Sequence, residues 1–88
     1  MKIANILAQP DYTLKITTTE GLVGVFDVAP YLTLEAFEPL QNLNNFMHVL
    51  NGGYFIEWDC GADLSADTVE AKWVVVKSHM PASNAGFK

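Results

Sequence analysis

The N-terminal part of the chain alternates hydrophobic and polar side chains, which predicts β-strands. Residues 2–9 alternate loosely and end at the turn signal Pro10-Asp11. Residues 12–17 then alternate, with Tyr12, Leu14 and Ile16 on one face and Thr13, Lys15 and Thr17 on the other, before a second turn at Glu20-Gly21. Because a period of two is typical of a half-buried strand, we predict an antiparallel hairpin over residues 12–28.

The apolar spacing changes after Pro30 and becomes nearer three than two. It predicts short helical turns over residues 31–46, since Pro39 prevents one continuous helix. Asn42 and Asn44 are candidate helix caps. We expect these turns to place a set of apolar side chains over the sheet, namely Leu34, Phe37, Leu40 and Phe46.

A second hairpin is predicted over residues 46–58. Asn51-Gly52-Gly53 supplies residues that tolerate a positive φ in a tight turn. Each predicted strand places alternating side chains on one face: Phe46, His48 and Leu50 in the first strand, and Tyr54, Ile56 and Trp58 in the second.

The C-terminal part begins with a helical stripe, in which Val69, Trp73 and Val76 recur at i, i+4 and i+7. Three consecutive β-branched valines leave residues 73–77 open between helix and strand. Residues 78–88 lack periodicity and predict a flexible tail. We therefore predict one α+β domain over residues 1–77, a small antiparallel sheet from two hairpin units with short helical segments, in the order βββ-α-ββ-α.

Composition narrows the possible functions. The 88 residues suffice for one domain with a modest core, and half of them are hydrophobic. Ten carboxylates oppose five scattered lysines, and the chain has no arginine. This balance argues against direct nucleic-acid binding and favours a basic partner surface. The single cysteine, the lack of a signal-peptide pattern and the lack of a long apolar run predict a cytoplasmic protein that makes no membrane contact.

The stretch "WDCGADLSAD", residues 58–67, is the first place to seek chemistry. An EF-hand loop that starts at Asp59 fails, because Gly61 stands at a ligand position and Leu64 stands where the loop glycine belongs. The stretch instead suits a strand-to-helix joint with a flexible turn, an oxygen-bearing N-cap and a carboxylate near the positive end of the helix dipole. The residues for these structural roles are Gly61, then Asp63 or Ser65, and then Asp67.

Other catalytic candidates lack the groups that would have to act with them. Glu57 and Asp59 would share one strand face, but that face is predicted to be wet. Cys60 could pair with His48 or His79, yet the sequence offers no third group to orient such a pair. The chain also lacks the ligand spacing of a zinc site and the pattern of a phosphate loop. We therefore expect no catalytic residue, no metal and no cofactor.

The C-terminal segment carries more apolar side chains than the helical stripe uses. On so small a domain, unburied apolar surface often marks an interface. We expect self-association, for example as a homodimer, or binding to a protein partner through a surface that includes Val74, Val75 and Met80, with Phe87 part of the same surplus.

Two strings carry a family resemblance: "GLVGVFDVAPYLTLEAFEPLQNLNNFMHV" and "IEWDCGADLSADTV" resemble the bacterial domain of unknown function 2442. The family pattern of Phe-Asp-Leu, Pro-Leu-Leu, Phe-x-x-Leu, a strand-opening Phe and a closing loop corresponds here to Phe26-Asp27-Val28, Pro30-Tyr31-Leu32, Phe37 with Leu40, Phe46, and Trp58 to Val69. The chain departs from it at Asp59-Cys60, where Pro-Asn is usual, and at Ala66, where Pro is usual. The resemblance covers residues 3–73, and the departures weaken any chemistry based on Cys60.

The resemblance implies a small α+β domain with no established activity, whose members are often encoded beside another small protein in pairs that look like toxin–antitoxin modules. We therefore expect a non-enzymatic interaction or regulatory module that is antitoxin-like. The alternative is a metal- or small-ligand-binding domain that uses the acidic loop 59–70. A hydrolase built on paired carboxylates is the third hypothesis.

Overall fold

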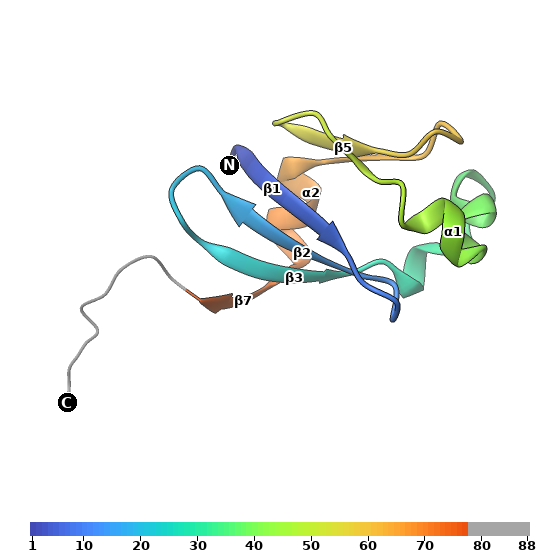
Figure 1. Cartoon of the computed structure of the whole chain (residues 1–88), viewed down its shortest axis with the longest axis horizontal. Helices are drawn as coiled ribbons and strands as arrows, with labels where there is room; N and C mark the ends of the chain where they lie inside the picture. Colours follow the sequence, from blue (N-terminus) through green and yellow to red (C-terminus); the bar gives the residue numbers. More distant parts are fainter. Residues whose placement is uncertain (78–88) are drawn as a thin grey trace.

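The computed structural model describes residues 1–77 (Figure 1). The predicted tail 78–88, with His79, Met80 and Phe87, lies outside the described residues. The predicted class, a small α+β fold of antiparallel strands with short helices, is confirmed. In chain order the elements are β1 (Ile3–Ala8), β2 (Thr13–Thr18), β3 (Val23–Asp27), the 3₁₀ helices η1 (Ala29–Tyr31) and η2 (Glu35–Gln41), α1 (Leu43–Phe46), β4 (Leu50–Asn51), β5 (Phe55–Glu57), β6 (Asp63–Ser65), α2 (Ala66–Lys72) and β7 (Val74–Lys77).

Four strands form the larger sheet, sheet A, in the antiparallel order β1-β2-β3-β7. The predicted hairpin is its centre, because Leu14 and Ile16 point into the core while Lys15 between them is exposed. The turn closes at Gly21, whose φ of +91° suits glycine and whose N–H donates to the Thr18 carbonyl at 3.0 Å. α2 covers one face of sheet A, and the other face is open toward the viewer of Figure 1.

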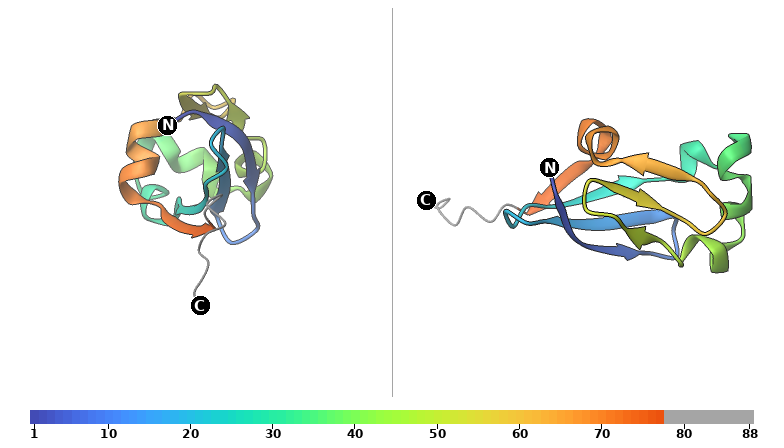
Figure 2. Two further views of the ribbon diagram at one scale, coloured as in Figure 1. Left: turned by 90° about the vertical axis from the view of Figure 1, so that its left-hand side faces the viewer. Right: turned by 90° about the horizontal axis from the view of Figure 1, so that it is seen from above.

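The remaining strands form a second, separate sheet, sheet B, in the order β4-β5-β6. The prediction of a single sheet is therefore wrong. Sheet B is tied to β1 by two hydrogen bonds: the Ile3 N–H donates to the Gly53 carbonyl at 2.7 Å, and Asn51 Nδ2 donates to the Ile3 carbonyl at 3.1 Å. Figure 2 shows that sheet A, sheet B and α2 are arranged around one core.

The segment after β3 forms helical turns, as predicted, and they break at Pro39. Three of the four expected side chains, Phe37, Leu40 and Phe46, are buried, but Leu34 is exposed. Phe46 and His48 are not strand residues: the Asn42 side chain accepts the Asn44 N–H at 2.9 Å and caps α1, which carries helical backbone as far as Phe46. The predicted first strand of the second hairpin thus shortens to β4, and Tyr54, expected beside Ile56 and Trp58 on the inner face, is exposed.

The helical stripe ends earlier than predicted. Val69 is buried and Trp73 is half-buried, but Val76 is exposed because the chain leaves the helix at Lys72 and enters β7. The β-branched valines favour the strand, since their side chains crowd a helical turn. The open question about residues 73–77 is therefore decided in favour of a strand from Val74.

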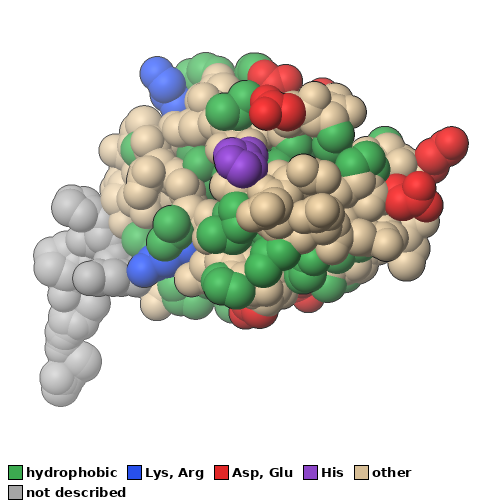
Figure 3. Space-filling view, turned by 45° about the vertical axis from the view of Figure 1, so that its right-hand side comes forward, with side chains coloured by type: hydrophobic (Ala, Val, Ile, Leu, Met, Phe, Trp, Pro, Cys, Tyr) green, Lys and Arg blue, Asp and Glu red, His purple; other side chains and the backbone are tan. Residues whose placement is uncertain are grey.

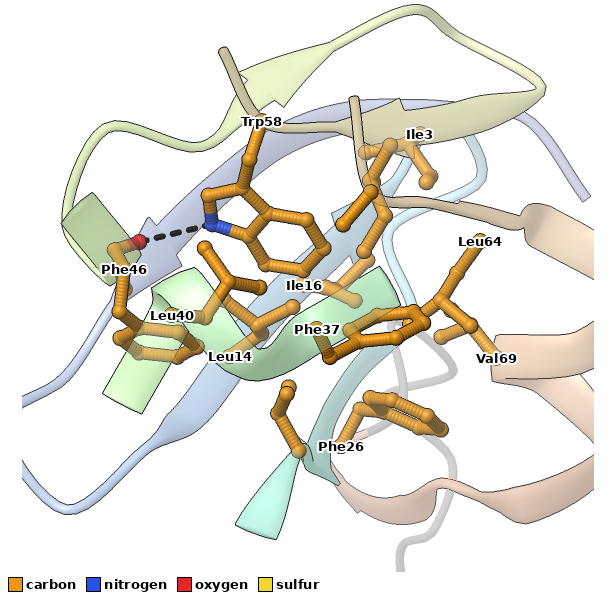
Figure 4. Packing of buried hydrophobic residues seen from close by; sticks show 14 of the residues in the cluster. Ile3, Leu14, Ile16, Phe26, Phe37, Leu40, Phe46, Trp58, Leu64 and Val69 are labelled. Carbon is orange, nitrogen blue, oxygen red and sulfur yellow. Dashed lines mark hydrogen bonds between the residues drawn. The ribbon is translucent and has the colours of Figure 1, made fainter. Parts of the chain in front are cut away.

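The core combines residues of both sheets with the helical segments (Figure 4). Trp58 is almost fully buried, and its indole N–H finds a partner in the Phe46 carbonyl, as a buried polar group requires. The largest fully buried side chains are those of Trp58, Phe26, Phe46, Leu14, Ile16, Leu40, Ile56, Val28 and Val69. Within residues 1–77, the helices are all too short to cross a lipid bilayer.

Candidate functional site

The acidic stretch 58–67 folds as a hairpin turn and not as a direct strand-to-helix joint. The Gly61 N–H donates to the Trp58 carbonyl at 2.9 Å, and the Trp58 N–H donates to the Ala62 carbonyl at 2.9 Å. Gly61 has a φ of +96°, so the flexible glycine stands where the turn needs it. The chain then forms β6, which was not predicted, before the helix begins at Ala66.

Ser65 is the N-cap of α2. Its Oγ accepts the Thr68 N–H at 3.1 Å, and Asp67 lies in the first helical turn. Asp63, the other candidate cap, instead lies in β6 directly opposite Glu57 of β5. The two alternatives for the cap are thus reduced to one.

The carboxylates of this region point to water. Glu57, Asp59, Asp63 and Asp67 are all exposed, and the carboxylates visible in Figure 3 protrude from the surface. Among residues 1–77, the side chains of His, Cys, Asp and Glu do not gather in a group of three or more that could hold a metal ion. The acidic loop 59–70 therefore offers no support for a metal centre in the described part of the chain.

One cavity, the His48 cavity, lies beside the turn. It has a volume of about 270 Å³ and is lined by Leu40, Asn45, His48, Trp58, Asp59 and Cys60. His48 Nδ1 lies 2.7 Å from the Asn44 carbonyl oxygen, which requires Nδ1 to carry the proton and leaves Nε2 as the acceptor of the neutral ring. The structure thus brings the candidate pair Cys60 and His48 to one hollow, where both are exposed. His79, the other candidate partner, lies outside the described residues.

A second cavity, the β3–α2 cavity, lies between the end of β3, η1 and the end of α2. It has a volume of about 360 Å³ and is lined by Phe26, Asp27, Pro30, Tyr31, Leu34 and Lys72. Sequence reasoning missed it, because Lys72 is far along the chain from the other five residues. Phe26-Asp27 and Pro30-Tyr31 stand in the stretch that carries the family resemblance, but nothing in that stretch points to Lys72.

The predicted interface segment is the edge strand β7. Val74, Val75 and Val76 are exposed, and β7 pairs only with β3 within the described residues. Met80, the third residue of the predicted surface, lies outside these residues. Exposed apolar side chains therefore coincide with an open sheet edge.

Comparison with known proteins adds one finding. No curated protein and no solved structure matches this chain. A family model described as "Protein of unknown function (DUF2442)" matches residues 3–74, which include every element from β1 to α2. The chain therefore belongs to the DUF2442 family.

Proposed function

We propose that this chain is a non-enzymatic protein-interaction module that receives a partner along the free edge of β7. The observation that carries the proposal is the exposure of three consecutive valines on that edge: 66% for Val74, 48% for Val75 and 57% for Val76. An open edge presents unpaired backbone donors and acceptors to another strand. Addition of a partner strand would satisfy these groups and cover the valines at the same time.

The surface beside β7 favours the same use. Val74 stands in a cross-strand row with Val25, Lys15 and Leu7 on the open face of sheet A. Leu7 is 54% exposed, and Lys15 is the one charged side chain in this row. A partner that spreads from the edge along this row would cover three apolar side chains and one lysine.

The net charge favours a different protein over a second copy. Each chain carries a formal charge of −5, so two copies repel one another before they meet. A partner of opposite charge is attracted to the molecule as a whole, while its apolar strand docks at β7. An antitoxin-like or otherwise regulatory role in the cytoplasm would act through this contact.

The acidic loop and the Cys60–His48 pair do not favour a competing function. The five carboxylates of residues 57–70 are dispersed over a turn, two strands and a helix, and each is exposed. His48 is oriented by a backbone carbonyl and not by a carboxylate. We therefore retain the non-enzymatic proposal over the ligand-binding loop and the hydrolase.

Co-expression with the product of the neighbouring gene tests the proposal. We expect the wild-type chain to co-purify with that product and a Val74→Lys/Val76→Lys double variant to lose it. Leu50→Lys is the matched control, since Leu50 is 49% exposed but lies on β4 in the other sheet. It should keep the complex.

Two outcomes would contradict the proposal. The wild-type chain could form no complex, or the complex could survive the valine double variant and fail with Leu50→Lys. Light scattering of the isolated chain measures its oligomeric state and completes the test. If the wild type is a dimer and the valine double variant is a monomer, the partner at β7 is a second copy of this chain and not a different protein.

A further inference from the structure

The β3–α2 cavity lies beside the end of β3, which β7 does not reach. β7 pairs with Val23, Gly24 and Val25, so Phe26 and Asp27 continue β3 beyond the last cross-strand partner on that side. η1 borders the gap from one direction and the C-terminal end of α2 from the other. No described residue of β7 lines the cavity, so it is separate from the outer edge of β7 where the partner is proposed to dock.

The walls of this cavity are apolar and partly fixed. The Phe26 side chain is buried, and its ring centroid lies 5.6 Å from that of Tyr31. Leu34, which was expected in the core, is instead 51% exposed and borders the same cavity together with Pro30. An apolar ligand group placed here would remove Leu34 and the exposed part of Tyr31 from water.

Two residues of opposite charge line this cavity. The Asp27 carboxylate is oriented locally, because its Oδ1 accepts the Ala29 N–H at 3.0 Å. Lys72 lies across the cavity at the end of α2. The structure records no ion pair between Asp27 and Lys72 within residues 1–77, so each retains capacity for a charged ligand group.

We propose that the β3–α2 cavity binds a zwitterionic apolar amino acid of the leucine or phenylalanine type. Its ammonium group binds Asp27, its carboxylate binds Lys72, and its side chain packs against Phe26, Tyr31 and Leu34. A volume of about 360 Å³ is at the lower end of the range for small-molecule sites, about 300–1,000 Å³, which suits a ligand of this size. A ligand with one charge would pair with only one of the two protein groups.

Titration of ¹⁵N-labelled protein with L-phenylalanine and with L-leucine tests the proposal on the wild-type chain. We expect saturable shifts of the backbone amides of Asp27, Tyr31, Leu34 and Lys72. L-Phenylalaninamide lacks the carboxylate and N-acetyl-L-phenylalanine lacks the ammonium, so each should bind about tenfold more weakly or worse. The absence of saturable shifts with both amino acids would overturn the proposal. Equal binding of the acetylated compound would overturn the role of Asp27 and point to a peptide chain end.

Three variants assign the contacts. Asp27→Asn keeps an oxygen for the Ala29 N–H but removes the charge, and Lys72→Gln removes the opposite charge. Both should weaken L-phenylalanine binding by about tenfold. Lys15→Gln is the matched control, because Lys15 is an exposed lysine of sheet A that does not line the cavity, and it should bind like the wild type.

The outcome is separable from the proposed partner interaction. Unchanged binding in Asp27→Asn and Lys72→Gln would overturn the assigned contacts even if a partner docks at β7. Loss of partner binding in the Val74→Lys/Val76→Lys variant would leave the amino-acid titration unaffected. Both comparisons require that each variant keeps the wild-type fold, which the amide spectrum of the variant checks.

Discussion

The indole N–H of Trp58 donates to the backbone carbonyl of Phe46 at 2.9 Å, and their two rings stack with centroids 6.0 Å apart (Figure 4). Phe46 is the last residue of α1, where helical carbonyls lose their intrahelical partners. Trp58 follows β5 and begins the turn of the acidic stretch. One buried hydrogen bond thus joins the helical segment to sheet B.

Trp58→Phe tests this junction. The variant keeps an aromatic ring but leaves the Phe46 carbonyl without its donor, which costs about 1–3 kcal/mol of the free energy of unfolding, and the smaller ring adds a cavity cost. Urea unfolding of the variant and the wild type measures the difference. Trp73→Phe is the control, because Trp73 is only half-buried, and it should lose less. An equal loss in both variants would mean that ring volume and not the hydrogen bond determines the effect.

The parts of the fold that were predictable are those whose signal is local. Apolar and polar side chains alternate from Thr13 to Thr17 in β2, so the faces of this strand could be assigned from neighbours in the sequence. β6 alternates over only three residues, too few to distinguish a strand from the polar cap of a helix. The division into two sheets depends on contacts such as that of Ile3 with Gly53, which no local pattern encodes.

The same distinction applies to the candidate sites. Ser65 could be named as a cap because the residues that it serves follow it directly in the chain. The β3–α2 cavity could not be named, because Asp27 and Lys72 line one cavity only after the chain has passed through both sheets. Val74 and Val75 are surplus to the predicted helical stripe, but their place on an edge strand follows from the pairing of β7 with β3.

Ser65→Ala and Asp63→Ala separate the two cap candidates. Removal of the Ser65 oxygen leaves the Thr68 N–H unpaired, so the free energy of unfolding should fall by about 0.5–2 kcal/mol. Asp63→Ala should change it by less than about 0.5 kcal/mol, since this exposed side chain stands opposite the like charge of Glu57. Chemical unfolding of the two variants under one condition decides, and a larger loss for Asp63→Ala would show that the cap has been misassigned.

Asp11 should titrate below its ordinary value. The Thr13 hydroxyl donates to Asp11 Oδ1 at 2.5 Å and thereby lowers the pKa of this carboxyl below 3.8. Because this pKa is lower in the folded state, the interaction stabilises the fold at pH values above the pKa of the unfolded state. The stabilisation is lost as the pH falls through the pKa of the folded state. In an NMR titration that follows the chemical shift of the Asp11 side-chain carboxyl carbon, Thr13→Val should move the midpoint back toward 3.8. Thr17→Val on the same strand is the control, and a shift of the Asp11 midpoint in that variant would contradict the assigned cause.

Gly24→Ala should loosen β7 from sheet A. A methyl group at Gly24 would meet the ring of Trp73 at less than 3.0 Å, so the ring that connects α2 to β7 must move. Overpacking of this kind costs about 1–3 kcal/mol. Relative to the wild type, hydrogen exchange should accelerate more for the β7 amides than for the β2 amides. Gly61→Ala is the contrast, because a methyl group there meets no atom within 4 Å. Its only destabilising effect is the strain of a φ of +96°. Since its strain lies in the β5–β6 turn, Gly61→Ala should leave the relative protection of β7 unchanged. If both variants lower stability and neither changes β7 selectively, Trp73 does not hold the edge strand in place.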